Sequence, residues 1–149
     1  MKRQMTYIQG ELFGDMPVED KPLVIPKANA AFDDLFHRLA QSKFRSSFHL
    51  TAQDVAYIRK NGLDKIRLHA ADFVSRRLAP AEPVNDGKQT PYRGHPVFKA
   101  QHATGCCCRG CFEKWHHVPK GVALTAGQCD YAVNVLMEWI VRQLTERNV

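Results

Sequence analysis

Hydrophobic residues recur at helical spacing along most of the chain beyond residue 28. In the first such segment, residues 30–41, apolar residues fall at positions i, i+3, i+4 and i+7: Phe32, Leu35, Phe36 and Leu39. Asn29 precedes this segment, and asparagine caps helices because its side-chain oxygen accepts a hydrogen bond from a free N–H of the first turn. The pattern therefore predicts a helix over residues 30–41.

The same spacing predicts helices along the rest of the chain. A second helix begins after Thr51, with Asp54 at the capping-box position, and ends at the Asn61-Gly62 pair. Further helices are predicted over residues 63–78, 96–103, 106–117 and from Thr125 to about Arg147. No segment shows the strict alternation of a strand. We therefore expect an all-α (or nearly so) fold, a compact bundle of about five to six helices.

Two regions lack a helical pattern. Residues 1–28 contain three prolines and read as an extended N-terminal arm. Residues 79–94 contain three more prolines and many polar residues, which predicts a long polar loop. We expect two parts, an arm over residues 1–28 and a single helical domain over residues 29–149 that carries a Cys/His site.

Composition limits the class of protein. The chain has 149 residues and a net charge of +6, a size typical of one domain and a basic excess that suits DNA or RNA without requiring it. No apolar run approaches the roughly 20 residues that span a bilayer, and the N-terminus lacks the apolar core of a signal peptide. We expect no membrane partner and a cytoplasmic location, where thiols stay reduced.

The densest group of chemically active side chains lies between His95 and His117. This stretch holds four of the five cysteines and four of the seven histidines. On a helix over residues 106–117, two cysteine pairs at spacings of three and four residues share one face, where their sulfurs can bind one Zn²⁺. Histidines on either side can complete the site. The predicted zinc ligands are His102, Cys107, Cys108, Cys111 and His116.

Other chemistry fits the same residues. Three or four cysteines can instead hold an iron–sulfur cluster. One cysteine near Arg109 and the histidines can be a catalytic thiolate, or the cysteines can be small buried hydrophobic residues. If the protein is an enzyme, Asp86 and His95 are the candidate acid–base groups.

Basic side chains near this site are candidates to contact the phosphates of a nucleic acid or another phosphate-bearing substrate. They are Arg45, Lys88, Arg93, Arg109 and Lys114.

The N-terminal arm contains one further motif, Gln9-Gly10-Glu11-Leu12-Phe13. It resembles the Q-x-x-L-F peptide by which bacterial DNA-processing proteins dock on the sliding clamp. In such a peptide the Gln9 amide anchors at a pocket edge, while Leu12 and Phe13 fill an apolar groove. The alternative is that Leu12 and Phe13 pack on the domain itself.

Several blocks of the sequence resemble a family of bacterial and phage proteins, domain of unknown function 4186. The blocks are SKFRSSFHL, APAEPVNDGKQTPYRGHPVFKAQHAT, CCRGCFEKWH and PKG, and the resemblance covers roughly residues 33–143. The family brings no established activity. Its pattern before CCRGC is Ala-Thr-Ala-Thr, where this chain has Ala103-Thr104-Gly105-Cys106. Cys106 thus looks particular to this chain, and the metal prediction shifts to Cys107, Cys108 and Cys111.

These observations support three hypotheses of function. The first is a metal-binding helical protein, with zinc, that acts in the nucleic-acid metabolism of a bacterium or phage. The second is a small metal- or cysteine-dependent enzyme that acts on a phosphate-bearing substrate. The third is an interaction factor between phage and host proteins, for which clamp binding through Gln9 to Phe13 is the specific expectation.

Overall fold

The computed structural model describes residues 23–147, and within this range the chain is helical with no strand. The α-helices are α2 (Asp33–Ala40), α3 (Ala52–Asn61), α4 (Leu63–Phe73), α5 (Pro96–Thr104), α6 (Arg109–His116) and α7 (Ala126–Glu146). Three shorter helical turns are η1 (Ala30–Phe32), η2 (Arg45–Ser47) and η3 (Val74–Leu78). The all-α prediction is confirmed. The clamp-like motif Gln9 to Phe13 lies outside the described residues.

Local capping fixes where several helices begin. The Asn29 side chain accepts the Ala31 N–H at 2.9 Å, as predicted, and opens η1. Thr51 and Asp54 form the predicted reciprocal capping box at the start of α3. Thr125 forms a second capping box with Gln128 at the start of α7. Each box satisfies backbone N–H groups that have no partner within the helix, so the sequence sets these boundaries locally.

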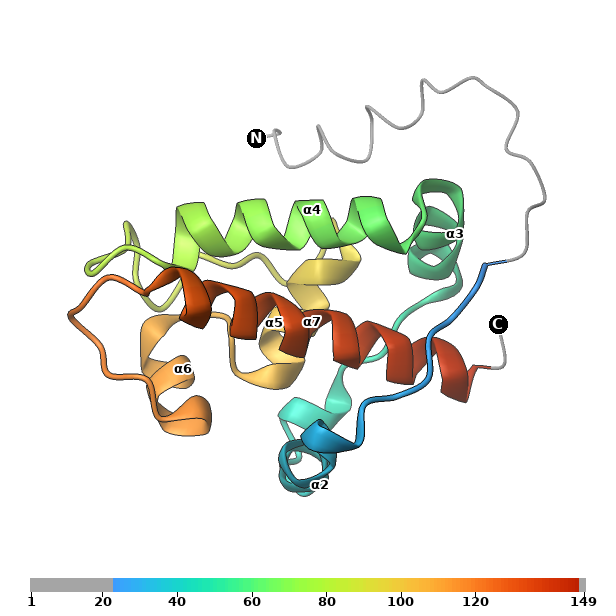
Figure 1. Ribbon diagram of the computed structural model, residues 1–149, viewed down its shortest axis with the longest axis horizontal. Helices are drawn as coiled ribbons and strands as arrows, with labels where there is room; N and C mark the ends of the chain where they lie inside the picture. The colour runs from blue at the N-terminus through green and yellow to red at the C-terminus, as the bar shows by residue number, and fades with distance from the viewer. Residues whose placement is uncertain (1–22, 148–149) are drawn as a thin grey trace.

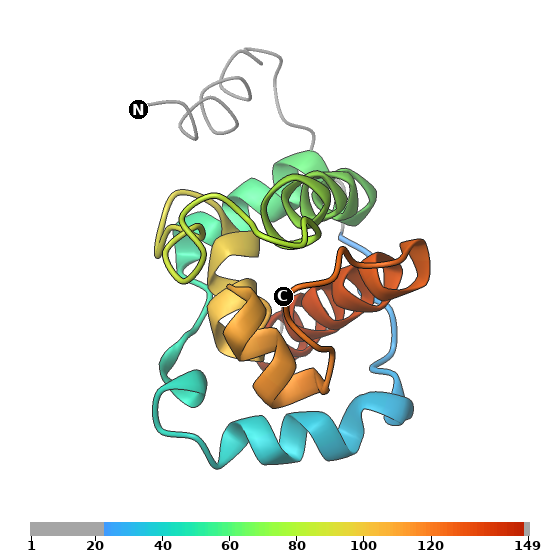
Figure 2. The same ribbon diagram turned by 90° about the vertical axis from the view of Figure 1, so that its left-hand side faces the viewer.

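The helices stack in three layers. α5 and α7 lie in the middle, with α4 on one side and α2 on the other (Figures 1 and 2). α4 and α7 run side by side in opposite directions (Figure 1). Most of α5 is buried, and eleven residues of α7 are buried. Within residues 23–147, no helix combines the length and hydrophobicity needed to cross a bilayer.

The predicted helix over residues 63–78 forms, but its last turn is wider than an α-helix. Residues of η3 continue α4 as a π-helix, and the Ala79 N–H donates to the Val74 carbonyl at 2.9 Å. The polar loop then begins, and it contains turns but no helix or strand up to His95. This loop brings the chain back to α5, beside the residues that follow α5.

The prediction of one helix over residues 106–117 is wrong at its start. Gly105 ends α5 in the left-handed conformation, with φ at +77°. The Cys106 N–H donates to the Gln101 carbonyl at 2.9 Å, so Cys106 belongs to the C-terminal cap of α5. Cys108 is extended and caps α6 through its sulfur, and the helix proper begins at Arg109. The cysteines therefore come together through a cap and an extended segment, not along one helix face.

Candidate metal centre

Three cysteines gather at the start of α6. The sulfur atoms of Cys107, Cys108 and Cys111 all lie within 4.8 Å of one another. Among the described residues, no other set of three His, Cys, Asp or Glu side chains meets this criterion. Cys107 is buried, and the other two are partly exposed. The structure thus brings together the cysteines to which the family resemblance points.

The backbone around the cysteines is held by three contacts. The Thr90 hydroxyl, buried in the polar loop, donates to the Cys107 carbonyl at 2.8 Å. The Cys108 sulfur accepts the Cys111 N–H at 3.5 Å. The Asp86 carboxylate accepts the Arg109 N–H at 3.3 Å. The polar loop therefore supports the segment that carries the sulfurs, and one backbone N–H already points at a sulfur.

Arg45 contacts two of the three sulfurs. It is only 8% exposed. Its Nη2 donates to the Cys111 sulfur at 3.1 Å, and its Nη1 lies 3.7 Å from the Cys107 sulfur and 2.6 Å from the His102 carbonyl. Burial lowers the pKa of Arg45, but its contacts with Cys111 and Cys107 outweigh burial and raise it. The structure places a permanent positive charge against the cysteine cluster.

The three thiols do not ionise alike. Hydrogen bonds from Cys107 and Cys108, and then from Arg45, hold the pKa of Cys111 well below its ordinary value. The same contacts with Cys108 and Cys111, together with burial, raise the pKa of Cys107. Of these two thiols, Cys111 is therefore the more acidic.

The donor set fits a thiophilic metal ion. Tetrahedral zinc with Zn–S bonds of about 2.3 Å places its sulfurs about 3.8 Å apart, which small side-chain rotations can reach from the separations seen here. Three thiolates around Zn²⁺ would carry a net charge of −1, and Arg45, which contacts the Cys107 and Cys111 sulfurs, would balance it. The cluster can hold a metal ion.

His102 lies beside the cluster but outside the group of three sulfurs. Its Nε2 lies 3.0 Å from the Thr90 carbonyl and 3.2 Å from the Pro91 carbonyl. Because carbonyls only accept, Nε2 carries the proton and Nδ1 keeps a lone pair. The ring stacks on Tyr92 with centroids 4.0 Å apart and an interplanar angle of 5°. Burial lowers the pKa of His102, which favours the neutral ring.

His116, the other predicted histidine ligand, is not brought to the three sulfurs. Its Nε2 donates to the Thr104 carbonyl at 2.7 Å, so its Nδ1 accepts the Tyr131 hydroxyl at 2.7 Å. It lies 3.7 Å from Cys106, whose pKa burial raises to about 12. Both ring nitrogens are engaged in holding α6 against the end of α5 and against α7.

Arg109, a predicted phosphate contact, is a buried structural side chain. It is 1% exposed. Its guanidinium donates at 2.8–2.9 Å to the carbonyls of Pro80, Pro119 and Val122. These contacts join α6 to the start of the polar loop and to the segment before α7. The geometry does not present Arg109 to a phosphate.

The two predicted acid–base residues lie in different surroundings. Asp86 is exposed on the polar loop. His95 is buried, accepts the Val97 N–H through Nδ1 at 3.0 Å, and places Nε2 2.9 Å from His69. Burial and the neighbouring His69 lower the pKa of His95 to about 3. The structure does not bring Asp86 and His95 together as a catalytic pair.

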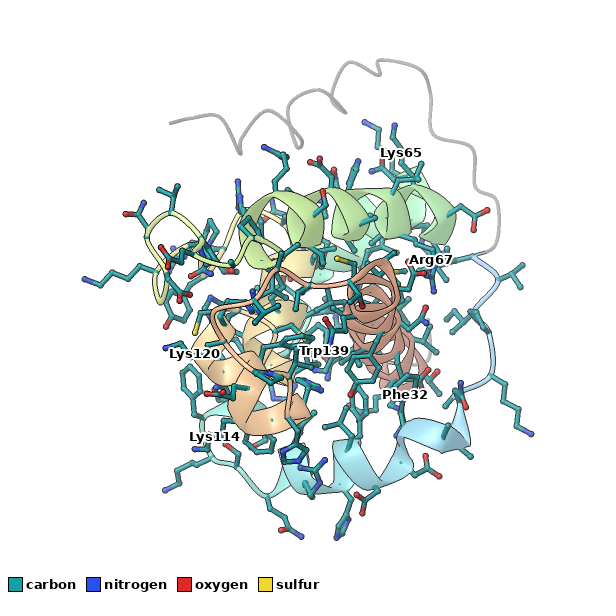
Figure 3. The ribbon with its side chains drawn as sticks, turned by 60° about the vertical axis from the view of Figure 1, so that its left-hand side comes forward. Phe32, Lys65, Arg67, Lys114, Lys120 and Trp139 are labelled. Carbon is teal, nitrogen blue, oxygen red and sulfur yellow. The ribbon has the colours of Figure 1, made fainter. Side chains whose placement is uncertain are left out.

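The remaining predicted phosphate contacts are exposed: Lys88, Arg93 and Lys114. Lys114 projects from α6, on the opposite side of the fold from Lys65 on α4 (Figure 3). A hollow of about 510 Å³ lies between α2, η2 and α7, and Arg45 lines it as well as contacting the sulfurs.

Sequence reasoning missed two parts of the site. Arg45 was expected to meet phosphate, and nothing in its local sequence indicates that it reaches cysteines more than 60 residues away. The contact between Thr90 and Cys107 was also missed, although a polar residue in a loop between prolines is a weak signal of an anchoring role.

Comparison with known proteins identifies a family. No solved structure matches the chain. The family model named domain of unknown function DUF4186 matches residues 33–141. This range includes η2, the polar loop and all three cysteines of the cluster. The chain therefore belongs to the DUF4186 family.

Proposed function

We propose that this protein binds zinc through Cys107, Cys108 and Cys111, and that the zinc-loaded protein acts on nucleic acid in bacterial or phage metabolism. The observation that carries the proposal is the group of three sulfurs within 4.8 Å, together with the buried Arg45 that contacts two of them. Plain burial of small hydrophobic residues does not explain a guanidinium directed at the sulfurs.

Zinc fits this site better than an iron–sulfur cluster does. Such clusters are held by four cysteine ligands as a rule. Cys106 faces His116 instead, and Cys129 lies on α7. Three thiolates leave the fourth position of a tetrahedral zinc to another donor. His102 is the candidate, because its lone pair is on Nδ1 and its Nε2–H donates to backbone carbonyls, an arrangement that orients the ring of zinc-ligating histidines.

The charge around the site supports a polyanionic partner. Residues 35–53 contain no Asp or Glu, and neither do residues 87–112. These two segments meet at the cluster through Arg45. Lys43, Lys88 and Arg93 lie in them and are exposed. Exposed cations in segments without acidic residues attract phosphates and release their counterions.

Metal analysis tests the zinc proposal. Protein purified without metal-affinity resin should contain about one zinc per chain, as expected for a single structural site, by inductively coupled plasma mass spectrometry. The Cys108→Ser/Cys111→Ser variant should lose the zinc, whereas Cys129→Ser, which removes a cysteine outside the cluster, should keep it. Folded wild-type protein that takes up no zinc from buffered solution would overturn the proposal.

A further inference from the structure

Exposed aromatic rings lie in a row next to the cysteine cluster. Phe44 is 48% exposed and Tyr92 is 59% exposed. Phe48 joins them, with its centroid 5.2 Å from that of Phe44 and 6.3 Å from that of Tyr92. Phe48 and Tyr92 are nearly parallel, at 13°. Segments far apart in the sequence thus combine into one aromatic surface, which we call the ring platform (Phe44, Phe48 and Tyr92).

The ring platform is connected to the metal centre at two points. Tyr92 stacks on His102, the candidate fourth ligand. The Arg45 guanidinium lies 5.0 Å from the centroid of the Phe44 ring and also contacts the Cys111 sulfur. A flat group stacked on Phe44 would be separated from the cluster by Arg45, and one stacked on Tyr92 by His102. Hydrophobic core packing alone does not require two large rings to remain half exposed beside such a site.

Positive charge flanks the ring platform. Lys43 precedes Phe44 and Arg93 follows Tyr92, and both are exposed. Two acidic residues in segments that adjoin the platform in sequence have polar partners. Asp54 pairs with Lys99 at 2.6 Å, and Asp86 accepts the Arg109 N–H. The platform thus offers flat apolar faces, and each of its two exposed rings has an exposed cation next to it in the sequence.

We propose that the ring platform, with Lys43 and Arg93, binds single-stranded nucleic acid, a proposal that rests on the proposed role in nucleic-acid metabolism. Bases of a single strand expose the π faces that stack on aromatic side chains, while the cations contact phosphates. In a duplex the same faces are covered by neighbouring base pairs. The platform therefore favours single strands over duplexes, and it places the bound strand beside the metal centre.

Fluorescence anisotropy with a labelled thymidine oligonucleotide of about 20 residues tests the proposal, a length that covers several stacking positions. Zinc-loaded wild-type protein should bind this strand more tightly than a duplex of the same length. Tyr92→Ala and Phe44→Ala should each raise the Kd about tenfold, the loss expected for one stacked base. Tyr92→Phe, which keeps the ring, should retain binding. Lys43→Ala should reduce the salt slope by about 0.7.

Matched controls lie on α4. Leu68→Ala removes an exposed apolar side chain and Lys65→Ala an exposed charge, and neither should change the Kd. Zinc content is measured on every sample, so loss of metal is distinguished from loss of the platform. Stoichiometric zinc with no binding of the strand, or with equal binding by the Tyr92→Ala and Phe44→Ala variants, would overturn the inference and leave the zinc proposal standing. Preference for the duplex would also overturn it.

Discussion

Replacing Arg109 with methionine tests whether this side chain holds the fold together. The guanidinium donates three hydrogen bonds of 2.8–2.9 Å to the carbonyls of Pro80, Pro119 and Val122. Methionine fills part of the space but donates nothing, so partly buried carbonyls on two separate segments lose their partner. An apolar replacement of a buried ion can be neutral when its partners are replaced as well, but here the partners are backbone groups that remain.

The expected loss follows from these three bonds. A hydrogen bond to a charged group contributes about 1.5–3 kcal/mol, so three give an upper limit of roughly 5–9 kcal/mol. Water that enters after truncation satisfies part of this loss. We expect Arg109→Met to lower the free energy of unfolding by about 3–5 kcal/mol, as other broken buried networks do. For a domain of this size the Tm should fall by about 6–20 °C.

Thermal unfolding followed by far-UV circular dichroism measures this change. The matched control is Lys114→Met, which removes an exposed charge from the same helix and should leave the Tm unchanged within about 2 °C. If Arg109→Met unfolds within about 2 °C of wild type, the carbonyl contacts do not stabilise the protein and the reasoning is refuted.

Three further outcomes follow from single side chains. Burial and His69 lower the pKa of His95 to about 3 in the folded protein. As the pH drops below about 6.5, the His95 side chain is protonated in the unfolded chain but not in the folded one, so the free energy of unfolding falls. Urea unfolding should show that the free energy of unfolding falls by about 2 kcal/mol between pH 7 and 5, and His95→Gln should remove that part of the pH dependence. An equal pH dependence in wild type and His95→Gln would contradict this prediction. Arg45→Met should weaken zinc binding about tenfold in chelator competition; an unchanged affinity would show that Arg45 does not stabilise the bound metal through its contacts with Cys107 and Cys111. Gly105→Ala should lower the Tm of the protein strongly, because the φ of Gly105 is +77° and an added Cβ would lie 2.7 Å from the Trp115 ring. An added Cβ at Gly110 meets nothing within 4 Å, so Gly110→Ala is the control. Similar Tm values for the two variants would refute this prediction.

Local signals predicted the helices well. Capping residues and apolar spacing act within one turn, so Thr51, Asp54 and Thr125 mark helix starts without knowledge of the tertiary fold. The error at residues 106–108 has a tertiary cause. Cys106 closes the preceding helix and Cys108 caps the next, and helical spacing does not reveal either role.

The candidate site was only partly predictable for a similar reason. The cysteine spacing indicated which sulfurs can meet, and the structure groups them. Contacts between segments far apart in the sequence could not be predicted from local patterns. Arg45 and Cys111 are 66 residues apart, and Arg109, which the sequence predicts as a surface cation, is buried with backbone carbonyls as its partners. Charge in the sequence does not distinguish a solvated cation from one that is buried against backbone oxygen.

Zinc K-edge X-ray absorption on the zinc-loaded full chain tests the central claim most directly. The account predicts a first shell dominated by about three sulfurs at about 2.3 Å, with at most one lighter donor at about 2.0–2.1 Å. The shell should lose sulfur in Cys111→Ser and remain unchanged in Cys129→Ser. A first shell made only of nitrogen and oxygen would contradict it, because the bound zinc would then lie away from Cys107, Cys108 and Cys111.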